Sequence, residues 1–145
     1  MDEKAVLPLS KERVIEALKS LELRYFIDSD GDIGFFISET CIFFSFDGKD
    51  KEILGMHVNP FRDVPMSELP QLQNFINAWN GRCYWPRAFT SVNDEGILRV
   101  RSDDAFDYEA GVSHIQLCEH IRRVTATVTQ LYRELDDARS RGWEE

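Results

Sequence analysis

Residues 28–39 are DSDGDIGFFISE, a stretch that two incompatible structures could explain. Carboxylates at its first, third and fifth positions and a glutamate at its twelfth have the ligand spacing of a calcium-binding EF-hand loop. The same letters also fit a tight turn over Asp28–Asp32, followed by a strand of alternating apolar residues. The choice between the two structures decides the fold of the first half of the chain.

The calcium loop does not meet the requirements of an EF-hand. Such a loop needs a glycine at its sixth position and a helix on each side, but the sixth residue here is Ile33 and the flanks YFI and FFI have strand character. In a strand, which rises about 3.3 Å per residue, Glu39 is carried out of reach of Asp28. We therefore interpret the stretch as a turn and a strand, and expect no metal site.

The surrounding region, residues 23–59, has an apolar period of two and is divided into four runs by short turn signals. This pattern predicts a four-stranded antiparallel meander. The turn lengths set its register: the first turn pairs Tyr25 with Phe35, and the second is expected to pair Phe35 with Phe44. These residues then share one apolar face, which helices are expected to cover.

The reverse side of the meander lacks the polar rows of a solvated sheet face. Monomers seldom leave a large apolar patch exposed without a use, so we expect the final helix of the chain or another body to cover it. The expected interaction surface consists of Phe26, Phe36, Phe43 and Ile53.

Helical patterns flank the meander. A first helix follows Ser10, a second runs over residues 67–81, and a third runs from residue 113 to about residue 138. Between the last two, residues 84–92 and 97–102 flank NDEG as a hairpin. The sequence therefore predicts an α+β fold in the order α-β-β-β-β-α-β-β-α, with an antiparallel sheet of about six strands and helices packed on the sheet.

The final helix has a broad apolar stripe. Cys118, Thr125 and Tyr132 widen this stripe beyond the narrow seam of a coiled coil. The width favours packing across a sheet, and a seam between two copies of the chain is the alternative. The residues of the stripe are Leu117, Ile121, Val124, Val128, Leu131 and Leu135.

Composition narrows the possible partners. With 26 acidic and 17 basic residues, the formal charge of −9 repels phosphate backbones and anionic membranes, so neither nucleic acid nor a membrane is an expected partner. The length fits a single domain over residues 1–145, with an ordered core over about residues 10–138. No signal peptide or membrane span is apparent, and three widely spaced cysteines suggest free thiols, so we expect a cytoplasmic protein.

Few residues in the sequence suggest catalysis or metal binding. His114 and Cys118 have a spacing that could hold zinc, but Cys118 falls among apolar residues and is interpreted as core. His57 is interpreted as a strand-edge residue because no nucleophile motif stands beside it, and residues 103–111 as a solvated loop. Phosphate-binding, dinucleotide-binding and hydrolase motifs are missing from the sequence. We expect no enzyme, no cofactor and no metal.

The stretch LPQLQNFINAWNGRCYWPRAF, followed by DEGILRV and GVSHIQL, resembles the YbjN-like bacterial family over most of residues 10–135. The resemblance implies an α+β domain similar to type III secretion chaperones. It also implies a role in regulation or sensory transduction, with no established reaction. The matching positions are Asn77 and Asn80, Trp85-Pro86, Asp94-Glu95-Gly96, and Gly111-Val112-Ser113.

Asn77 and Asn80 bracket Trp79 near a helix end, where asparagine amides commonly bond to loose backbone carbonyls. We interpret both as structural caps or bridges to the neighbouring strand, rather than as site residues.

The leading functional hypothesis is a non-enzymatic protein-interaction or regulatory domain with a chaperone-like fold, which binds a partner or a second copy of itself through an apolar face of the sheet and helix. The expected partner is a second copy, as a homodimer, or an unknown protein client. The alternative is a small-molecule or metal-binding sensor with a pocket between sheet and helices, lined by Trp79, Tyr84 and Trp85.

Overall fold

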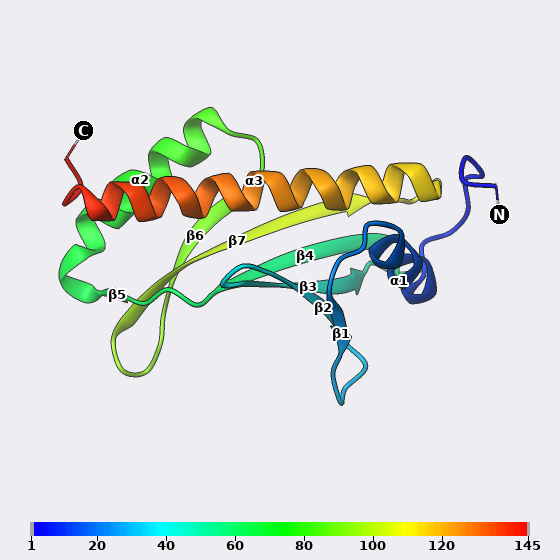
Figure 1. Ribbon diagram of the computed structural model, residues 1–145, viewed down its shortest axis with the longest axis horizontal. Helices are drawn as coiled ribbons and strands as arrows, with labels where there is room; N and C mark the ends of the chain where they lie inside the picture. Colours follow the sequence, from blue (N-terminus) through cyan, green and yellow to red (C-terminus); the bar gives the residue numbers. More distant parts are fainter. Residues whose placement is uncertain (1, 145) are drawn as a thin grey trace.

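The computed structural model describes residues 2–144, which form three α-helices and a seven-stranded sheet (Figure 1). A single 3₁₀ turn, η1, precedes the second helix. In chain order the elements are α1 Lys11–Ser20, β1 Tyr25–Ile27, β2 Ile33–Ile37, β3 Thr40–Asp47, β4 Ile53–Pro60, β5 Val64–Pro65, η1 Met66–Glu68, α2 Leu69–Arg82, β6 Arg87–Val92, β7 Ile97–Asp107 and α3 His114–Ser140.

All strand pairs are antiparallel, and the spatial order along the main path is β1-β2-β3-β4-β7-β5. The long strand β7 pairs with β4 on one side and with β6 on the other, because His57 and Arg87 both lie opposite Asp103. The predicted α+β class and antiparallel sheet are confirmed. The short strand β5 is an addition, in the segment between the predicted meander and the predicted second helix.

The stretch over Asp28–Asp32 is a turn, and a strand follows it. The Oδ1 atom of Asp28 accepts hydrogen bonds from the backbone N–H groups of Asp30 and Asp32, each at 2.9 Å. Gly31 has a φ of 83°, which glycine adopts without strain. The strand interpretation is therefore confirmed, and the helices of an EF-hand do not flank this loop.

The register is right at the first turn and wrong at the second. Tyr25 lies opposite Phe35, as predicted, but Phe35 lies opposite Ile42 rather than Phe44. The second turn holds two residues instead of four, because Ser38 adopts a φ of 50° that closes a tight hairpin. A slip of two residues keeps every side chain on its expected face.

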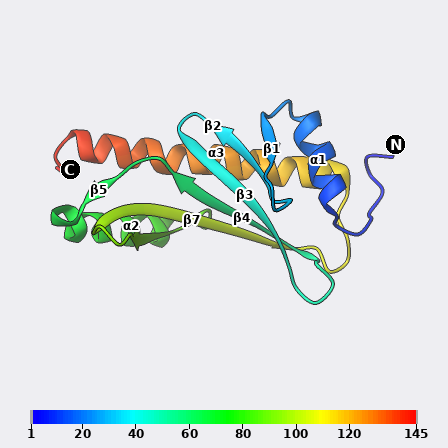
Figure 2. The same cartoon turned by 90° about the horizontal axis from the view of Figure 1, so that it is seen from below.

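The three helices pack on one face of the sheet, which we call the helix face; we call the other the open face. One core joins residues of all three helices to the strand residues Phe35, Ile42 and Leu54. The Tyr132 hydroxyl of α3 donates to the Val100 carbonyl of β7 at 2.8 Å. Seen from below, the hairpin of β2 and β3 crosses in front of α3 (Figure 2). The final helix therefore leaves the open face uncovered.

The apolar stripe of α3 is buried against the sheet, which confirms sheet packing as its main role. The helix begins with a capping box, in which Ser113 and Gln116 bond to each other's backbone N–H groups. The buried residues of the stripe are Leu117, Ile121, Val124, Val128, Leu131 and Leu135.

The prediction of a solvated loop over residues 103–111 is wrong for its first half. Residues up to Asp107 continue β7 and pair with β4, so Asp104 lies opposite Met56 on the helix face and is buried. The concentration of carboxylates hid the alternation of this strand, since Asp104 occupies a position where the pattern requires an apolar residue.

Candidate protein-interaction surface

Three of the four predicted interaction residues meet on the open face. Phe26, Phe36 and Phe43 come from β1, β2 and β3, and the ring centroid of Phe26 lies 5.1 Å from that of Phe36 and 5.6 Å from that of Phe43. We call these three residues the Phe cluster. Its members are separate from the helix-face core, and Phe36 is 43% exposed.

A glycine lets the Phe cluster form. Gly34 lies opposite both Phe26 and Phe43 in the strand register. A Cβ atom on Gly34 would come within 2.5 Å of the Phe26 ring, so only glycine allows this ring to lie over the strand. The result is an apolar surface on the β1–β3 half of the open face.

Ile53 lies on the same face but outside the Phe cluster. It is four residues along β4 from His57, the residue opposite Phe43. At about 3.3 Å per residue, this places Ile53 roughly 13 Å along the strand from the cluster.

An exposed residue near the cluster was missed by the sequence analysis. The N–H of Phe61 donates to the Glu39 carbonyl at 3.1 Å, which continues the β3–β4 pairing one step past Pro60. Strand alternation assigns Phe61 to the open face. The Asn59-Pro60 pair had suggested that the strand ends before it.

The open face becomes polar beyond β3. In one row across the sheet, Phe43 lies opposite His57, and His57 opposite Asp103. The His57 Nδ1 atom is 2.9 Å from Asp103 Oδ1, and its Nε2 atom is 2.7 Å from Ser45 Oγ. The interpretation of His57 as a strand-edge residue is therefore wrong, because β4 is paired with β3 on one side and with β7 on the other. This pairing brings the partners of His57 together without any short sequence motif.

Ser45, His57 and Asp103 have the order of a nucleophile, a base and an orienting acid. However, the Ser45 hydroxyl also donates to Asp47 Oδ2 at 2.7 Å. This carboxylate competes with His57 for the hydroxyl proton, and its charge opposes an oxyanion at Ser45. The geometry supports a hydrogen-bond chain that joins β3, β4 and β7, and not acyl transfer.

The two asparagines near the end of α2 differ in their surroundings. The Asn80 side chain donates to the Ala88 carbonyl at 2.9 Å and accepts from the Ala88 N–H at 3.0 Å, so it bridges α2 and β6. Asn77 is exposed on the same helix.

The three aromatic residues suggested for a sensor pocket do not gather around one cavity. Trp79 is buried, and its indole N–H donates to the Pro86 carbonyl at 2.9 Å. Tyr84, in contrast, is 95% exposed, and Trp85 packs against Phe106 and Arg123 at the surface.

Two residue groups have metal-ligand chemistry. His114 Nε2 lies 3.5 Å from Cys118 Sγ and 3.1 Å from Ser20 Oγ, and burial raises the pKa of the Cys118 thiol. Both features suit a buried polar contact better than a zinc thiolate. The carboxylates of Asp28, Asp30 and Asp32 lie within 4.8 Å of one another, but all three residues are exposed and Asp28 already caps the turn.

Asp104 is the most unusual titratable group on the helix face. Within the described residues, neither of its carboxylate oxygens has a hydrogen-bond partner. Burial, with a smaller contribution from the charge of Asp103, raises the pKa of Asp104 to about 7. The group therefore links the stability of the core to pH.

These features define an α+β domain with one helix-covered sheet face and one open face that carries an apolar cluster. The model of the YbjN family, described as "Putative bacterial sensory transduction regulator", matches residues 10–137. The chain belongs to this family.

A solved structure shares the fold. The crystal structure of YbjN from E. coli, described as a putative transcription regulator, has a TM-score of 0.79 at 12% identity and covers 93% of this chain and 96% of that one. A chain of the HopA1-SchA chaperone-effector complex has a TM-score of 0.48 at 16% identity, with 88% and 97% covered. No curated protein matches the sequence. Among residues 2–144, no helix has the length and apolarity to cross a membrane.

Proposed function

We propose that this chain is a non-enzymatic regulatory domain that acts through protein–protein contact, and that its open face binds a second copy of the chain. The observation that supports this most strongly is the Phe cluster, in which Phe36 is exposed and Phe26 and Phe43 are half-buried, on a face that α3 leaves uncovered. The family description as a regulator agrees with such a role. The proposal also takes the chain as a single domain in the cytoplasm, a reducing compartment in which its three free cysteines would stay as thiols.

The shape of the open face suits packing against another sheet. Two sheets pack face to face at about 10 Å when their facing side chains interdigitate. Gly34 and Gly55 have no side chain to project from the open face. A larger residue would collide with the Phe26 ring at position 34 and with the Ser45 hydroxyl at position 55. Burial of the Phe cluster would contribute about 25 cal/mol per Å² of apolar area removed from water.

Charge on the open face also favours self-association of an acidic chain. The polar half of this face includes Arg87, Arg99 and Arg101. Arg99 pairs with Asp63 at 2.8 Å, whereas Arg87 and Arg101 have no ion pair among residues 2–144. Basic side chains at this interface reduce the repulsion between two copies that each have a net charge of −9.

The test is the mass in solution of Phe36→Asp beside a matched control. Ile115 on α3 is 44% exposed, nearly the same as Phe36, but lies on a helix away from the open face. Light scattering should give twice 16.9 kDa for the unmodified chain and for Ile115→Asp, and 16.9 kDa for Phe36→Asp. Circular dichroism must show that both variants keep the same fold.

A folded Phe36→Asp variant with an unchanged dimer mass would place the interface elsewhere. An unmodified chain that remains at 16.9 kDa at high concentration would reject the dimer itself.

A further inference from the structure

Strand β3 extends beyond the strand that pairs with it. The register between β2 and β3 stops at Gly34 and Phe43, yet β3 continues to Asp47. On its other side β3 stays paired with β4 as far as the Asp47–Ile53 pair. Within the described part of the chain, residues 44–47 therefore have a neighbouring strand on the β4 side only, and their other side is a free sheet edge next to the start of β2.

The pairing pattern shows which backbone groups are at this edge. The Phe61 N–H donates to Glu39, so the odd-numbered residues of β3 bond to β4 and the even-numbered ones face the opposite way. The residue at the expected partner position for Phe46 is Gly31, but its N–H donates to Asp28 and its carbonyl accepts from Lys11. The backbone N–H and C=O groups of Phe46 thus point toward this free sheet edge.

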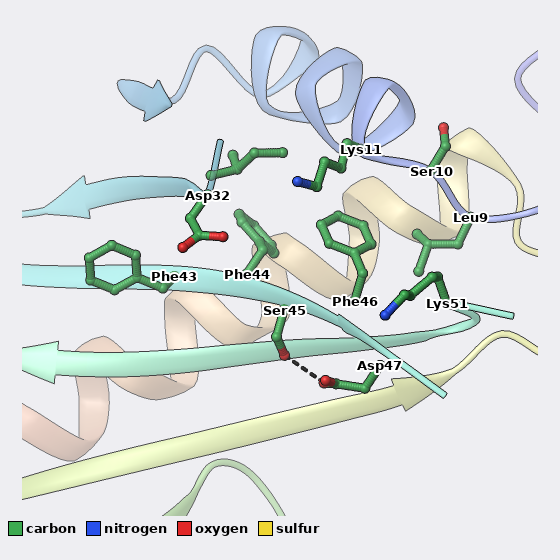
Figure 3. A pocket seen from close by; sticks show the side chains of 11 residues that line it. Leu9, Ser10, Lys11, Asp32, Phe43, Phe44, Ser45, Phe46, Asp47 and Lys51 are labelled. Carbon is green, nitrogen blue, oxygen red and sulfur yellow. Dashed lines mark hydrogen bonds between the residues drawn. The ribbon is translucent and has the colours of Figure 1, made fainter. Parts of the chain in front are cut away.

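A groove of about 560 Å³ lies along this edge (Figure 3). Leu9 and Lys11 at the start of α1 form one wall, and Phe44 and Phe46 form the other on the helix-face side. Phe43 and Ser45 also line it, so the groove is continuous with the open face. Its volume is within the range of sites that hold ligands of several hundred daltons, and fits a short extended peptide.

The charges around the groove favour a basic ligand. Asp32 and Asp47 line the groove, and Asp32 belongs to the turn in which three carboxylates lie within 4.8 Å of one another. Two lysines also line it, Lys11 and Lys51, and the hydrogen bond from the Lys11 ammonium to the Gly31 carbonyl, at 3.2 Å, orients that charge without removing it. The two lysines face four carboxylates, the three of the turn and that of Asp47, so the local charge is negative.

We propose that this groove binds an extended segment of another protein, which adds an antiparallel strand to β3 and alternates apolar and basic residues. The residue opposite Phe46 would exchange backbone hydrogen bonds with it and direct its apolar side chain toward Phe44, Phe46 and Leu9. Its two neighbours would direct basic side chains toward the open-face side, near Asp47. This inference rests on the proposed protein-interaction function and adds a client site to it.

The probe is the labelled peptide acetyl-KVKVKVK-amide, with acetyl-EVEVEVE-amide as its charge control. We expect anisotropy to show at least tenfold tighter binding of the lysine peptide. N-methylation of the valine amides, which face β3 in this arrangement, should weaken binding at least tenfold, whereas N-methylation of lysine amides should change it less than threefold. Any other methylation pattern, or equal binding of both peptides, overturns the proposal.

A pair of variants locates the binding at Phe46. Phe46→Pro and Phe46→Ala both remove the ring, but only proline removes the N–H that faces the groove, and an edge position of this kind tolerates proline. With both folded by circular dichroism, Phe46→Pro should bind the lysine peptide at least tenfold more weakly than Phe46→Ala. Equal binding by the two variants contradicts strand addition at this edge.

The dimer proposal and the groove proposal can be rejected independently of each other. Phe36→Asp should become a monomer and keep its affinity for the lysine peptide within threefold, because Phe36 does not line the groove. A chain that forms the dimer but binds neither peptide would overturn the groove inference alone. A monomeric chain that binds the lysine peptide would overturn the dimer alone.

Discussion

Phe35 and Phe36 are neighbours in the chain and lie in the same strand, but their surroundings are opposite. Phe35 is 0% exposed beneath the helices, whereas Phe36 is 43% exposed on the open face. Strand alternation directs them to different sides, and the three helices cover only one of those sides. The comparison shows that two apolar sets in one sheet can have different surroundings, one packed in the core and one at the surface, where we propose that it serves in recognition.

The largest expected effect is a direct test of this contrast. Phe35→Ala should lower the free energy of unfolding by about 3–5 kcal/mol, because it leaves a cavity in the core. Phe36→Ala should lower it by less than about 1 kcal/mol in the monomer, since much of this ring is already in contact with water. Urea denaturation at a protein concentration that keeps both chains monomeric measures the difference. Equal losses of unfolding free energy in the two variants would contradict the difference between the two faces of the sheet.

The next effect comes from Asp104, a buried carboxyl group on the helix face. The pKa of Asp104 is raised to about 7 from an ordinary value of 3.8, so the folded chain binds this proton more tightly than the unfolded chain. Its contribution to stability is present below about pH 4 and is lost as pH rises to about 7. Asp104→Asn should therefore be more stable than the unmodified chain at pH 8, by roughly 4 kcal/mol.

The same variant should show little difference from the unmodified chain near pH 4, where both side chains are neutral. Thermal or urea unfolding at the two pH values gives the comparison, and contributions of other groups cancel between the chains. A stability difference that is the same at both pH values would show that Asp104 ionises normally within the core.

A smaller effect is expected at the edge of the helix face. Asn80→Ala removes both hydrogen bonds to Ala88 and should destabilise the fold by about 1–2 kcal/mol. Asn77→Ala, on the exposed surface of the same helix, is the matched control and should change stability by less than about 0.5 kcal/mol. If the two variants lost the same stability, the bridge between α2 and β6 would have no particular importance.

The smallest effect concerns the turn at residues 28–32. Calcium at 1 mM should change the melting temperature by less than about 1 °C, because the turn is formed by hydrogen bonds to Asp28 and its three acidic residues are exposed to solvent. Differential scanning fluorimetry with and without a chelator measures this shift. A rise of several degrees would instead assign the turn to metal binding.

The sequence was most informative where patterns are local. The period-two runs and the turn at Asp28 predicted the four strands of the meander and the faces of their phenylalanines, because side-chain direction in a strand depends only on parity. The register past Ile37 was wrong, since hairpin turn length depends on a left-handed Ser38 that serine does not usually signal.

Pairings between distant strands were beyond the reach of the sequence. Ser45 and Asp103 contact His57 only because β3, β4 and β7 are aligned in a particular register. The buried Asp104 interrupted an apolar alternation that would have identified the end of β7. The free edge at Phe46 likewise depends on where β2 begins relative to β3, and this is set by the folded sheet.

The most direct test of the central claim is hydroxyl-radical footprinting of the open face over a range of protein concentrations. Phe36 should be oxidised in dilute solution and become protected as the concentration rises, because a second copy covers it. Tyr84, which is 95% exposed and far from the Phe cluster in the fold, should react equally throughout. Oxidation of Phe36 that is independent of concentration would contradict the account.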